Sequence, residues 1–466
     1  MGITLYKNAD WILTVNEKRE KFRHGDLLIS GKEILDVGND LEKKYAGKLQ
    51  IDKTIDAKGT VILPGFVNIH HHTWQSLIRN IQATRGLKLE PWLTVMYEIY
   101  KDLNTDVARA GVYSGLGDML KTGCTTSNDL WYPHPVGVKY LVDAEIQAAA
   151  EIGIRFHPTR GFHSVPSDIV PPEVVDTKES VTEDTIRLVK KYHDRSRFSM
   201  CQVGIAPSIA QYETEDIIEA VVDLAEEYDI MVHGHLAESQ HEVEYTLKTW
   251  GCRPFEWFKR HRLLGKRFYF AHCIHLNEEE IEQMAETETG VAHCPISNIS
   301  SGACPVPSYL KHGLTRIGLG VDGAASSNSS NMLEEIRCAY LLNRLTWGDQ
   351  AATPDDYLYM ATAGGAKVLG RDDIGYLAPG MAADFTVMDW NQLTYAGGCY
   401  DPVACIVESG DPRLVKDVVV NGELVVSSGK LTKVNEEEKR DYVNQVGKDL
   451  LTRASARIDS LKEDIN

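Results

Sequence analysis

Eight short apolar segments alternate with helix-like stretches through the middle of this chain, and this alternation limits the folds that it can adopt. The segments span residues 61–72, 125–131, 155–161, 201–208, 230–238, 267–275, 290–298 and 316–323. The intervening stretch 214–228 shows apolar residues at helical spacing after a Thr that can cap the helix. Alternating β and α segments imply a parallel sheet, and eight such units predict an α/β fold of the (β/α)8 barrel type.

Both ends of the chain carry a β-hairpin pattern. Residues 26–38 place short apolar runs around Ser30-Gly31, and residues 417–429 do the same around Asn421-Gly422. An Asn-Gly pair between apolar runs is a strong hairpin signal, because both turn positions require a positive φ. We therefore expect the two termini to meet in one small β domain, although two unrelated hairpins would give the same pattern.

These patterns divide the chain into four parts. We expect the small β domain to take residues 1–60 and 373–433, and the barrel to take residues 61–372. Residues 434–466 contain apolar side chains at helical spacing. They predict a C-terminal helix that packs on the body of the protein, with a helix for binding a partner as the alternative.

The composition narrows the class of protein. The chain has 49 Lys and Arg against 67 Asp and Glu, a formal net charge of −18, whereas nucleic acids and anionic membranes select basic surfaces. It contains no apolar stretch long enough to span a bilayer, and its first residues lack a secretory signal pattern. Its nine cysteines include no CxxC pair, which favours free thiols in a reducing cytoplasm. We expect a cytoplasmic protein with no nucleic-acid or membrane partner.

Polar side chains stand at the ends of the predicted strands, where barrel enzymes keep their chemistry. The residues are His70 to His72, His233 with His235, His272, His293 and Asp322. Side chains two apart on a strand face the same side, so His70 and His72 can bind one metal ion together. Imidazole nitrogen suits Zn²⁺ or Fe²⁺.

The third ligand is not fixed by spacing alone. His235 is the natural candidate, but His233 lies on the same face of the same strand, where a hydrogen-bonded core histidine is the other interpretation. Asp322 is a carboxylate in an otherwise apolar strand. Because burying it unpaired would be costly, a role as ligand or base is favoured.

Several motifs along the chain resemble the amidohydrolase superfamily. They are PGFVNIHHH, HGHLAES, AHCIHL, GVAHCPISN, GLGVDG, MATAGGAKVLGR and IGYLAPGMAADFTVMD. The resemblance covers about residues 1–430 and is strongest to the mononuclear aminohydrolases, which include guanine and 8-oxoguanine deaminases, S-adenosylhomocysteine-type deaminases and s-triazine hydrolases. It implies a metal-bearing (β/α)8 barrel with a β-sandwich built from both termini, and a homodimer or larger assembly.

The resemblance also assigns roles to particular residues. It implies metal ligands at His70, His72, His235 and Asp322, and catalytic roles for Glu238, His272 and Asp322. Dinuclear relatives need a lysine at the end of the fourth strand, where this chain has CQVGIAPSIA. One divalent metal ion is therefore expected, Zn²⁺ before Fe²⁺.

The implied reaction is hydrolytic deamination. A bound divalent metal lowers the pKa of water towards neutrality. Asp322 would accept the water proton, His272 would orient the water, and Glu238 would protonate the ring nitrogen beside the attacked carbon. Triazine dechlorinases can lack the aspartate or alter the HxxE acid. This chain has both residues, Asp322 and Glu238, which favours release of ammonia. Their presence also disfavours a barrel retained only as a scaffold.

The substrate is narrowed less than the reaction. The segments around His70 to Leu77 and Glu90 to Tyr97 resemble the 8-oxoguanine deaminase branch. Candidate substrate-binding residues are Gln75, Trp92, Arg160 and His293. Core packing is the alternative for Trp92, a buried ion pair for Arg160, and a supporting position behind the pocket wall for His293.

The loop after the fourth strand departs from this branch. APSIAQYETED is shorter than the loop of related deaminases. Guanine, pterins, isocytosine-like pyrimidines and hydroxytriazines present the same N=C–NH₂ unit. The prediction is therefore a small aminated heterocycle, 8-oxoguanine or a related purine or pterin. The alternatives are a hydroxytriazine or isocytosine-type aminohydrolase and a dechlorinating s-triazine hydrolase.

Overall fold

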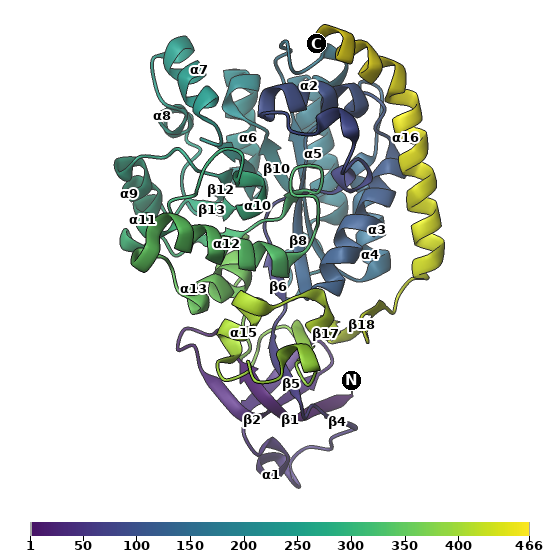
Figure 1. The fold of residues 1–466 in the computed structure, drawn as a ribbon, viewed down its shortest axis with the longest axis vertical. Helices are drawn as coiled ribbons and strands as arrows, with labels where there is room; N and C mark the ends of the chain where they lie inside the picture. Colours follow the sequence, from purple (N-terminus) through teal and green to yellow (C-terminus); the bar gives the residue numbers. More distant parts are fainter. Residues whose placement is uncertain (1, 466) are drawn as a thin grey trace.

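A parallel barrel, a mixed sheet and a long helix along one side make up the computed structural model, which describes residues 2–465 (Figure 1). The barrel sheet has the strand order β14-β13-β12-β11-β10-β9-β8-β6, with every paired neighbour parallel. The strands are β6 (Phe66–Asn68), β8 (Cys124–Trp131), β9 (Arg155–Phe162), β10 (Gly204–Pro207), β11 (Val232–Leu236), β12 (Phe268–His272), β13 (Gly290–His293) and β14 (Ile317–Leu319). The predicted barrel fold is confirmed.

Two short strands continue the closure of the barrel beyond β6 and β14. The Ile69 amide donates to the Leu319 carbonyl at 3.1 Å. Next, β7 (His71–His72) pairs in parallel with β15 (Asp322–Gly323). This pairing brings the His70 to His72 segment and Asp322 together, although 250 residues separate Asp322 from His72.

The smaller domain is one mixed sheet built from both ends of the chain, as predicted. Its strands are β1 (Ile3–Leu13), β2 (Lys21–Ser30), β3 (Glu33–Gly38), β4 (Lys53–Asp56), β5 (Thr60–Pro64), β16 (Phe385–Asp389), β17 (Val415–Val420), β18 (Glu423–Ser427) and β19 (Lys430–Leu431). Asn421 and Gly422 both have positive φ, 52° and 79°. A Cβ on Gly422 would lie 1.9 Å from the Gly31 carbonyl oxygen. The two hairpin turns from opposite ends of the chain therefore pack on each other.

The first predicted barrel strand, 61–72, is divided between the two sheets. Its beginning is β5, which pairs with β1 and β16 in the small sheet, and only β6 belongs to the barrel sheet. The chain passes from the small sheet to the barrel sheet at Gly65, where a Cβ would lie 2.1 Å from the Thr125 side chain. This close approach lets one apolar run serve two sheets in succession.

Helices cover the outside of the barrel (Figure 1). They and the remaining short helices are α1 (Leu41–Tyr45), α2 (Leu89–Tyr100), α3 (Thr105–Lys121), α4 (Leu141–Ile152), α5 (Lys178–Tyr192), α6 (Glu215–Tyr228), α7 (Gln240–Trp250), α8 (Pro254–Arg260), α9 (Glu278–Thr287), α10 (Pro295–Asn298), α11 (Val306–Lys311), α12 (Met332–Trp347), α13 (Pro354–Tyr359), α14 (Gly365–Val368), α15 (Pro402–Ser409) and α16 (Glu436–Ile465). Helix α6 begins after Thr214, as the sequence predicts, but the Thr214 hydroxyl donates to Asp216 instead of capping a backbone amide.

The C-terminal helix α16 runs beside α2 and α3 (Figure 1). Leu450, Ala454 and Ile458 are buried on its inner face, and Arg457 pairs with Glu98 and Asp102. Because apolar burial and ion pairs both anchor α16, it packs on the protein as the apolar spacing predicts. In the part of the chain that is described, no helix has the length and apolar character needed to cross a membrane.

Candidate active site

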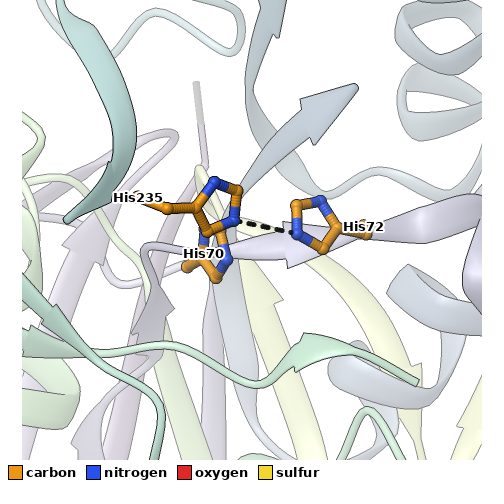
Figure 2. Close-up of side chains that lie close together, drawn as sticks. All are labelled: His70, His72 and His235. Atoms are coloured by element: carbon orange, nitrogen blue, oxygen red, sulfur yellow. Dashed lines mark hydrogen bonds between the residues drawn. The ribbon is translucent and has the colours of Figure 1, made fainter. Parts of the chain in front are cut away.

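The metal-ligand candidates lie at the carboxyl ends of the barrel strands. His70 directly precedes the short strand β7, His72 lies in it, and His235 lies in β11 (Figure 2). His71 faces away, and its Nε2 lies 3.1 Å from the Ser330 hydroxyl. The expected alternation of side chains is therefore present.

Backbone carbonyls fix the orientation of two of these imidazoles. His72 Nδ1 lies 2.8 Å from the Leu130 carbonyl oxygen, and His235 Nδ1 lies 2.7 Å from the Ser208 carbonyl oxygen. A carbonyl only accepts hydrogen bonds, so each Nδ1 carries the proton of the neutral ring. Each Nε2 consequently presents a lone pair, and these two nitrogens lie 3.4 Å apart.

His233 orients His70 in the same way, at one step further from the cavity. His233 Nδ1 lies 3.1 Å from the Tyr269 carbonyl oxygen, which places its proton on Nδ1 and leaves Nε2 as an acceptor. His70 Nδ1 donates to this Nε2 at 2.7 Å. The His70 Nε2 lone pair is therefore free. His233 is the hydrogen-bonded histidine behind the site, as one of the two interpretations of the sequence expects.

The free nitrogens form a donor set that fits a divalent cation. Ligand atoms of His70, His72 and His235 lie within 4.8 Å of one another. His70 Nε2 is buried without a hydrogen-bond partner, and Asp322 Oδ1 lies 3.4 Å from it and 3.3 Å from His72 Nε2. Three unprotonated imidazole nitrogens and a carboxylate match the ligand chemistry of a catalytic zinc site.

Protonation states support the same conclusion. Burial lowers the pKa of His72 to about 3, so the ring is neutral at pH 7. Burial opposes ionisation of Asp322, but the imidazoles of His70, His72 and His272 around it outweigh that effect and lower the Asp322 pKa well below its ordinary value. The histidines are thus uncharged ligands and Asp322 an anionic one, the forms that bind metal.

Glu238 and His272 stand beside this donor set. His272 Nδ1 lies 2.8 Å from Asn298 Oδ1, so its Nε2 faces the site as an acceptor, 3.6 Å from Glu238 Oε1. Burial raises the pKa of Glu238 to about 7, with the Asp322 charge contributing. A carboxyl group with this pKa holds a proton at neutral pH that it can donate.

The loop that carries Glu238 is held by a second carboxylate. The amides of Ala237 and Glu238 donate to the two oxygens of Glu242, at 3.1 and 2.9 Å. Ala237 has a φ of 50°, and His272 and Asp322 have φ of 70° and 57°. Non-glycine residues with positive φ are uncommon and concentrate at functional sites. Their presence at three strand ends marks this edge of the barrel.

A cavity of about 460 Å³ opens above these side chains. Gln75 and Trp92, two of the candidate substrate-binding residues, line it. Gln75 Nε2 donates to the Tyr100 hydroxyl at 3.1 Å, while Gln75 Oε1 is buried without a partner. A Cβ at Gly323 would lie 1.9 Å from Gln75 Oε1, so only glycine leaves room for this amide.

The sequence of residues 61–425 matches the Amidohydrolase family. The chain belongs to the amidohydrolase family. An 8-oxoguanine deaminase of Pseudomonas aeruginosa is 36% identical over 379 residues, 80% of this chain and 84% of that protein. A hydroxydechloroatrazine ethylaminohydrolase of Pseudomonas sp. strain ADP is 32% identical over 453 residues, 94% of each chain.

A solved hydrolase structure shares this architecture. The atrazine chlorohydrolase of Arthrobacter aurescens TC1, determined as a zinc complex, has a TM-score of 0.89 and 25% identity. The match covers 95% of this chain and 100% of that one. This amidohydrolase is thus a hydrolase with a donor set for a divalent metal ion.

Two predicted substrate-binding residues lie outside the lining of this amidohydrolase cavity. Arg160 is 2% exposed and donates to Asp176 at 2.9 Å and Asp184 at 3.0 Å, which is the ion-pair alternative. These carboxylates neutralise its charge, and Arg160 is not among the residues that line the cavity. His293 is 4% exposed and is not among the residues that line the cavity, and burial lowers its pKa to about 3.

The cavity also contains a network that the sequence analysis missed. His163 Nε2 lies 2.6 Å from the Tyr97 hydroxyl, and His163 Nδ1 lies 3.6 Å from Glu213 Oε1. Tyr97 and His163 line the cavity. His163 directly follows the last residue of β9, so the strand-end position that singled out the other histidines applied to it as well.

Proposed function

We propose that this hydrolase releases ammonia from an amino-substituted N-heterocycle, with 8-oxoguanine or a related purine or pterin as its substrate. The observation that carries the reaction is the position of Glu238. Its carboxyl group lies within 3.6 Å of His272 Nε2, and burial raises its pKa to about 7. The identity to an 8-oxoguanine deaminase supports the choice of substrate.

One divalent metal ion completes the proposed site. His70, His72, His235 and Asp322 would hold it, and their nitrogen-rich set favours Zn²⁺, with Fe²⁺ as the alternative. When bound, such an ion supplies Lewis acidity that lowers the pKa of a nearby water molecule towards neutrality.

Asp322, His272 and Glu238 each have a separate role in the proton transfers. Asp322, which stays ionised at neutral pH, accepts a proton from the attacking water. His272 accepts a hydrogen bond at Nε2 and so orients that water, because its Nδ1 is bonded to Asn298. Glu238 donates its proton to the ring nitrogen beside the attacked carbon. The tetrahedral carbon then loses ammonia: Asp322 returns its proton to the leaving amine, and the hydroxyl proton passes to Glu238 as the carbonyl forms.

Substrate orientation falls to the upper part of the cavity. Gln75 Oε1, buried and unpartnered, can accept an N–H of the heterocycle edge. Trp92 and Tyr132 provide aromatic wall on which a flat ring can pack. A planar heterocycle with an N–H group on its edge matches this combination.

The alternative function is hydrolysis of a triazine or an isocytosine-like ring. The hydroxydechloroatrazine ethylaminohydrolase match covers 94% of both chains, more than the deaminase match does. In that case an isocytosine-like ring or an aminotriazine would still release ammonia, whereas an alkylaminotriazine would release an alkylamine and a chlorotriazine would release chloride.

A substrate screen that measures ammonia, alkylamine and chloride release separates these functions. Metal-loaded protein would be incubated with 8-oxoguanine, guanine, pterins, isocytosine, aminotriazines and chlorotriazines. We expect ammonia release, fastest from an oxidised purine or pterin. Faster ammonia release from isocytosine or an aminotriazine, or release of chloride or an alkylamine from a triazine, would support the alternative. Metal-loaded protein that acts on none of these compounds would contradict both.

A further inference from the structure

A second cavity of about 460 Å³ opens at the other end of the barrel. Its wall includes Gly204, the first residue of β10, and Met231 and Arg267, which directly precede β11 and β12. These are amino-terminal strand ends, whereas the metal-ligating histidines lie at carboxyl ends. Among the described residues, none lines both cavities. We call this second space the basal cavity.

The inner wall of the basal cavity contains buried polar groups. Asn128 is fully buried, and its amide donates to the His157 carbonyl oxygen at 2.7 Å while its Oδ1 has no hydrogen-bond partner. His157 Nε2 lies 3.1 Å from Arg371 Nη1. A guanidinium only donates, so the proton of the neutral imidazole lies on Nδ1. An unpartnered acceptor deep in a polar cavity indicates a ligand group that donates a hydrogen bond.

The cavity is basic although the protein is acidic. Its wall carries five cationic side chains, namely Arg195, Arg197, Lys266, Arg267 and Arg371. Its carboxylates are Asp229, Asp372 and Asp373, which leaves an excess of two positive charges (5 − 3) in a chain of net charge −18. A cavity of reversed sign concentrates anions from solution.

Three of the arginines have guanidinium donors to spare. Arg195 and Arg267 share the single carboxylate of Asp229. Arg197 packs over the Phe198 ring at 5.0 Å and donates to a backbone carbonyl, with no carboxylate partner in residues 2–465. Arg371 differs, because both oxygens of Asp373 accept from it, at 2.8 and 2.9 Å. The first three are therefore the anion-binding candidates.

We propose that the basal cavity binds a phosphate ester that carries hydroxyl groups. Arg195, Arg197 and Arg267 would hold the phosphate, because the planar guanidinium matches pairs of phosphate oxygens. A hydroxyl group of the ligand would donate to Asn128 Oδ1 in the interior. The cavity volume of about 460 Å³ lies in the range of small-molecule sites, about 300–1,000 Å³, and exceeds what a bare phosphate needs.

Calorimetric titration of the full-length, metal-loaded protein tests this proposal. The probes are ribose 5-phosphate, inorganic phosphate and ribose. We expect ribose 5-phosphate to bind with a Kd at or below about 1 mM, and ribose not to bind. Tighter binding of the ester than of phosphate identifies an ester ligand, whereas equal affinities would reassign the site to free phosphate and overturn the ester.

Variants locate the binding site. The double substitution Arg195→Gln with Arg197→Gln should weaken ribose 5-phosphate binding at least about tenfold, since each removes a charge-assisted contact. Asp229→Asn should tighten it, because the two arginines would lose their shared competitor. Arg440→Gln, the same change on the exposed surface of α16, should have no effect. A gain in one variant and a loss in another separates binding from general damage to the fold.

Two results would overturn the proposal. One is the absence of binding by ribose 5-phosphate and phosphate alike. The other is binding that survives the double arginine substitution but disappears in Asp322→Asn, which would place the anion at the metal site. Ammonia release should be unchanged in the basal variants, because no basal residue lines the catalytic cavity.

Discussion

At the carboxyl end of the barrel several buried histidines converge on one point, whereas at the amino end a buried ion pair links the barrel to the small domain. His70, His72 and His235 direct free nitrogens at a shared centre, and His70 Nε2 has no protein partner. At the other end, Arg155 in β9 binds both oxygens of Asp384 in the small domain. The two cavities have the same volume, about 460 Å³.

This difference distinguishes buried polar groups that serve catalysis from buried polar groups that stabilise the fold. A paired buried charge such as Arg155 with Asp384 needs nothing further, because its partner compensates the loss of water. Converging lone pairs without donors require an external cation. Unsatisfied groups therefore locate function more sharply than burial or charge does, and the predictions below test this distinction.

Removing the converging carboxylates should have the largest effect. Asp322→Asn and Glu238→Gln should each lower kcat by about 10²–10⁴-fold, since each removes a proton acceptor or donor of the reaction. Asp322→Asn should also weaken metal binding, because it removes the anionic ligand. Turnover and metal content, measured on the same preparations, check both.

Stability supplies the control for this prediction. Glu238→Gln should unfold at the same denaturant concentration as the parent protein and keep its metal. Loss of activity together with loss of metal in Glu238→Gln would contradict its assignment as a proton donor.

Breaking a paired charge should instead cost stability. Arg155→Met leaves Asp384 buried without its cation and should lower the free energy of unfolding by about 3–5 kcal/mol. Denaturant titration measures this, with Arg262→Met as the matched control, since Arg262 pairs with Asp223 on the surface and should contribute less than about 1 kcal/mol.

The double variant sharpens the test. Arg155→Met with Asp384→Asn should recover part of the loss, because it removes the unpaired charge. The metal affinity of the folded protein should be unchanged in the single variant and in the double variant. A selective loss of metal would show that the amino end does more than hold the two domains together.

Local pattern predicted which candidate ligands gather at this end of the barrel, because strand periodicity and strand ends are properties of the sequence. His70, His72, His235 and Asp322 lie where that pattern places them. It could not choose between His235 and His233, since the choice depends on the Tyr269 carbonyl in a neighbouring strand.

The residues that sequence reasoning missed depend on partners far along the chain. Asn298 orients His272 across 26 residues, and Glu213 lies 3.6 Å from His163. Arg160 could have faced either the cavity or a carboxylate, and only the position of α5 brings Asp184 to it. The split of 61–72 at Gly65 likewise depends on contact with Thr125.

The pH dependence tests the electrostatics of the catalytic end. Burial raises the pKa of Glu238 to about 7, and the proposed donor is its protonated form. The ratio kcat/KM should therefore fall about tenfold per pH unit above pH 7. Glu238→Gln should lack this basic limb in its residual activity. A basic limb that persists in the variant would belong to another group.

The smallest effect is expected at a buried pair of carboxyl groups that contact Thr73, directly after the His70 to His72 segment. Asp129 accepts from the Thr73 amide at 2.6 Å, and the Thr73 hydroxyl donates to Glu145 at 2.6 Å. Burial raises the pKa of Asp129 to about 7 and raises that of Glu145. The folded protein thus holds a proton here that the unfolded chain releases above its ordinary Glu pKa of 4.5.

A proton held by the folded state stabilises it only at low pH. The contribution is complete below about pH 4.5 and is lost as the pH rises to 7 and beyond, so the free energy of unfolding should decline across that window. The glutamine in Glu145→Gln cannot ionise, so the variant should flatten this decline. At low pH it should lower the free energy of unfolding by about 1 kcal/mol, because one hydrogen bond is altered. Denaturant titrations from pH 5 to 8 measure the slope. An equally steep decline in the variant would mean that the proton lies elsewhere, and that the catalytic end owes its stability to groups other than this pair.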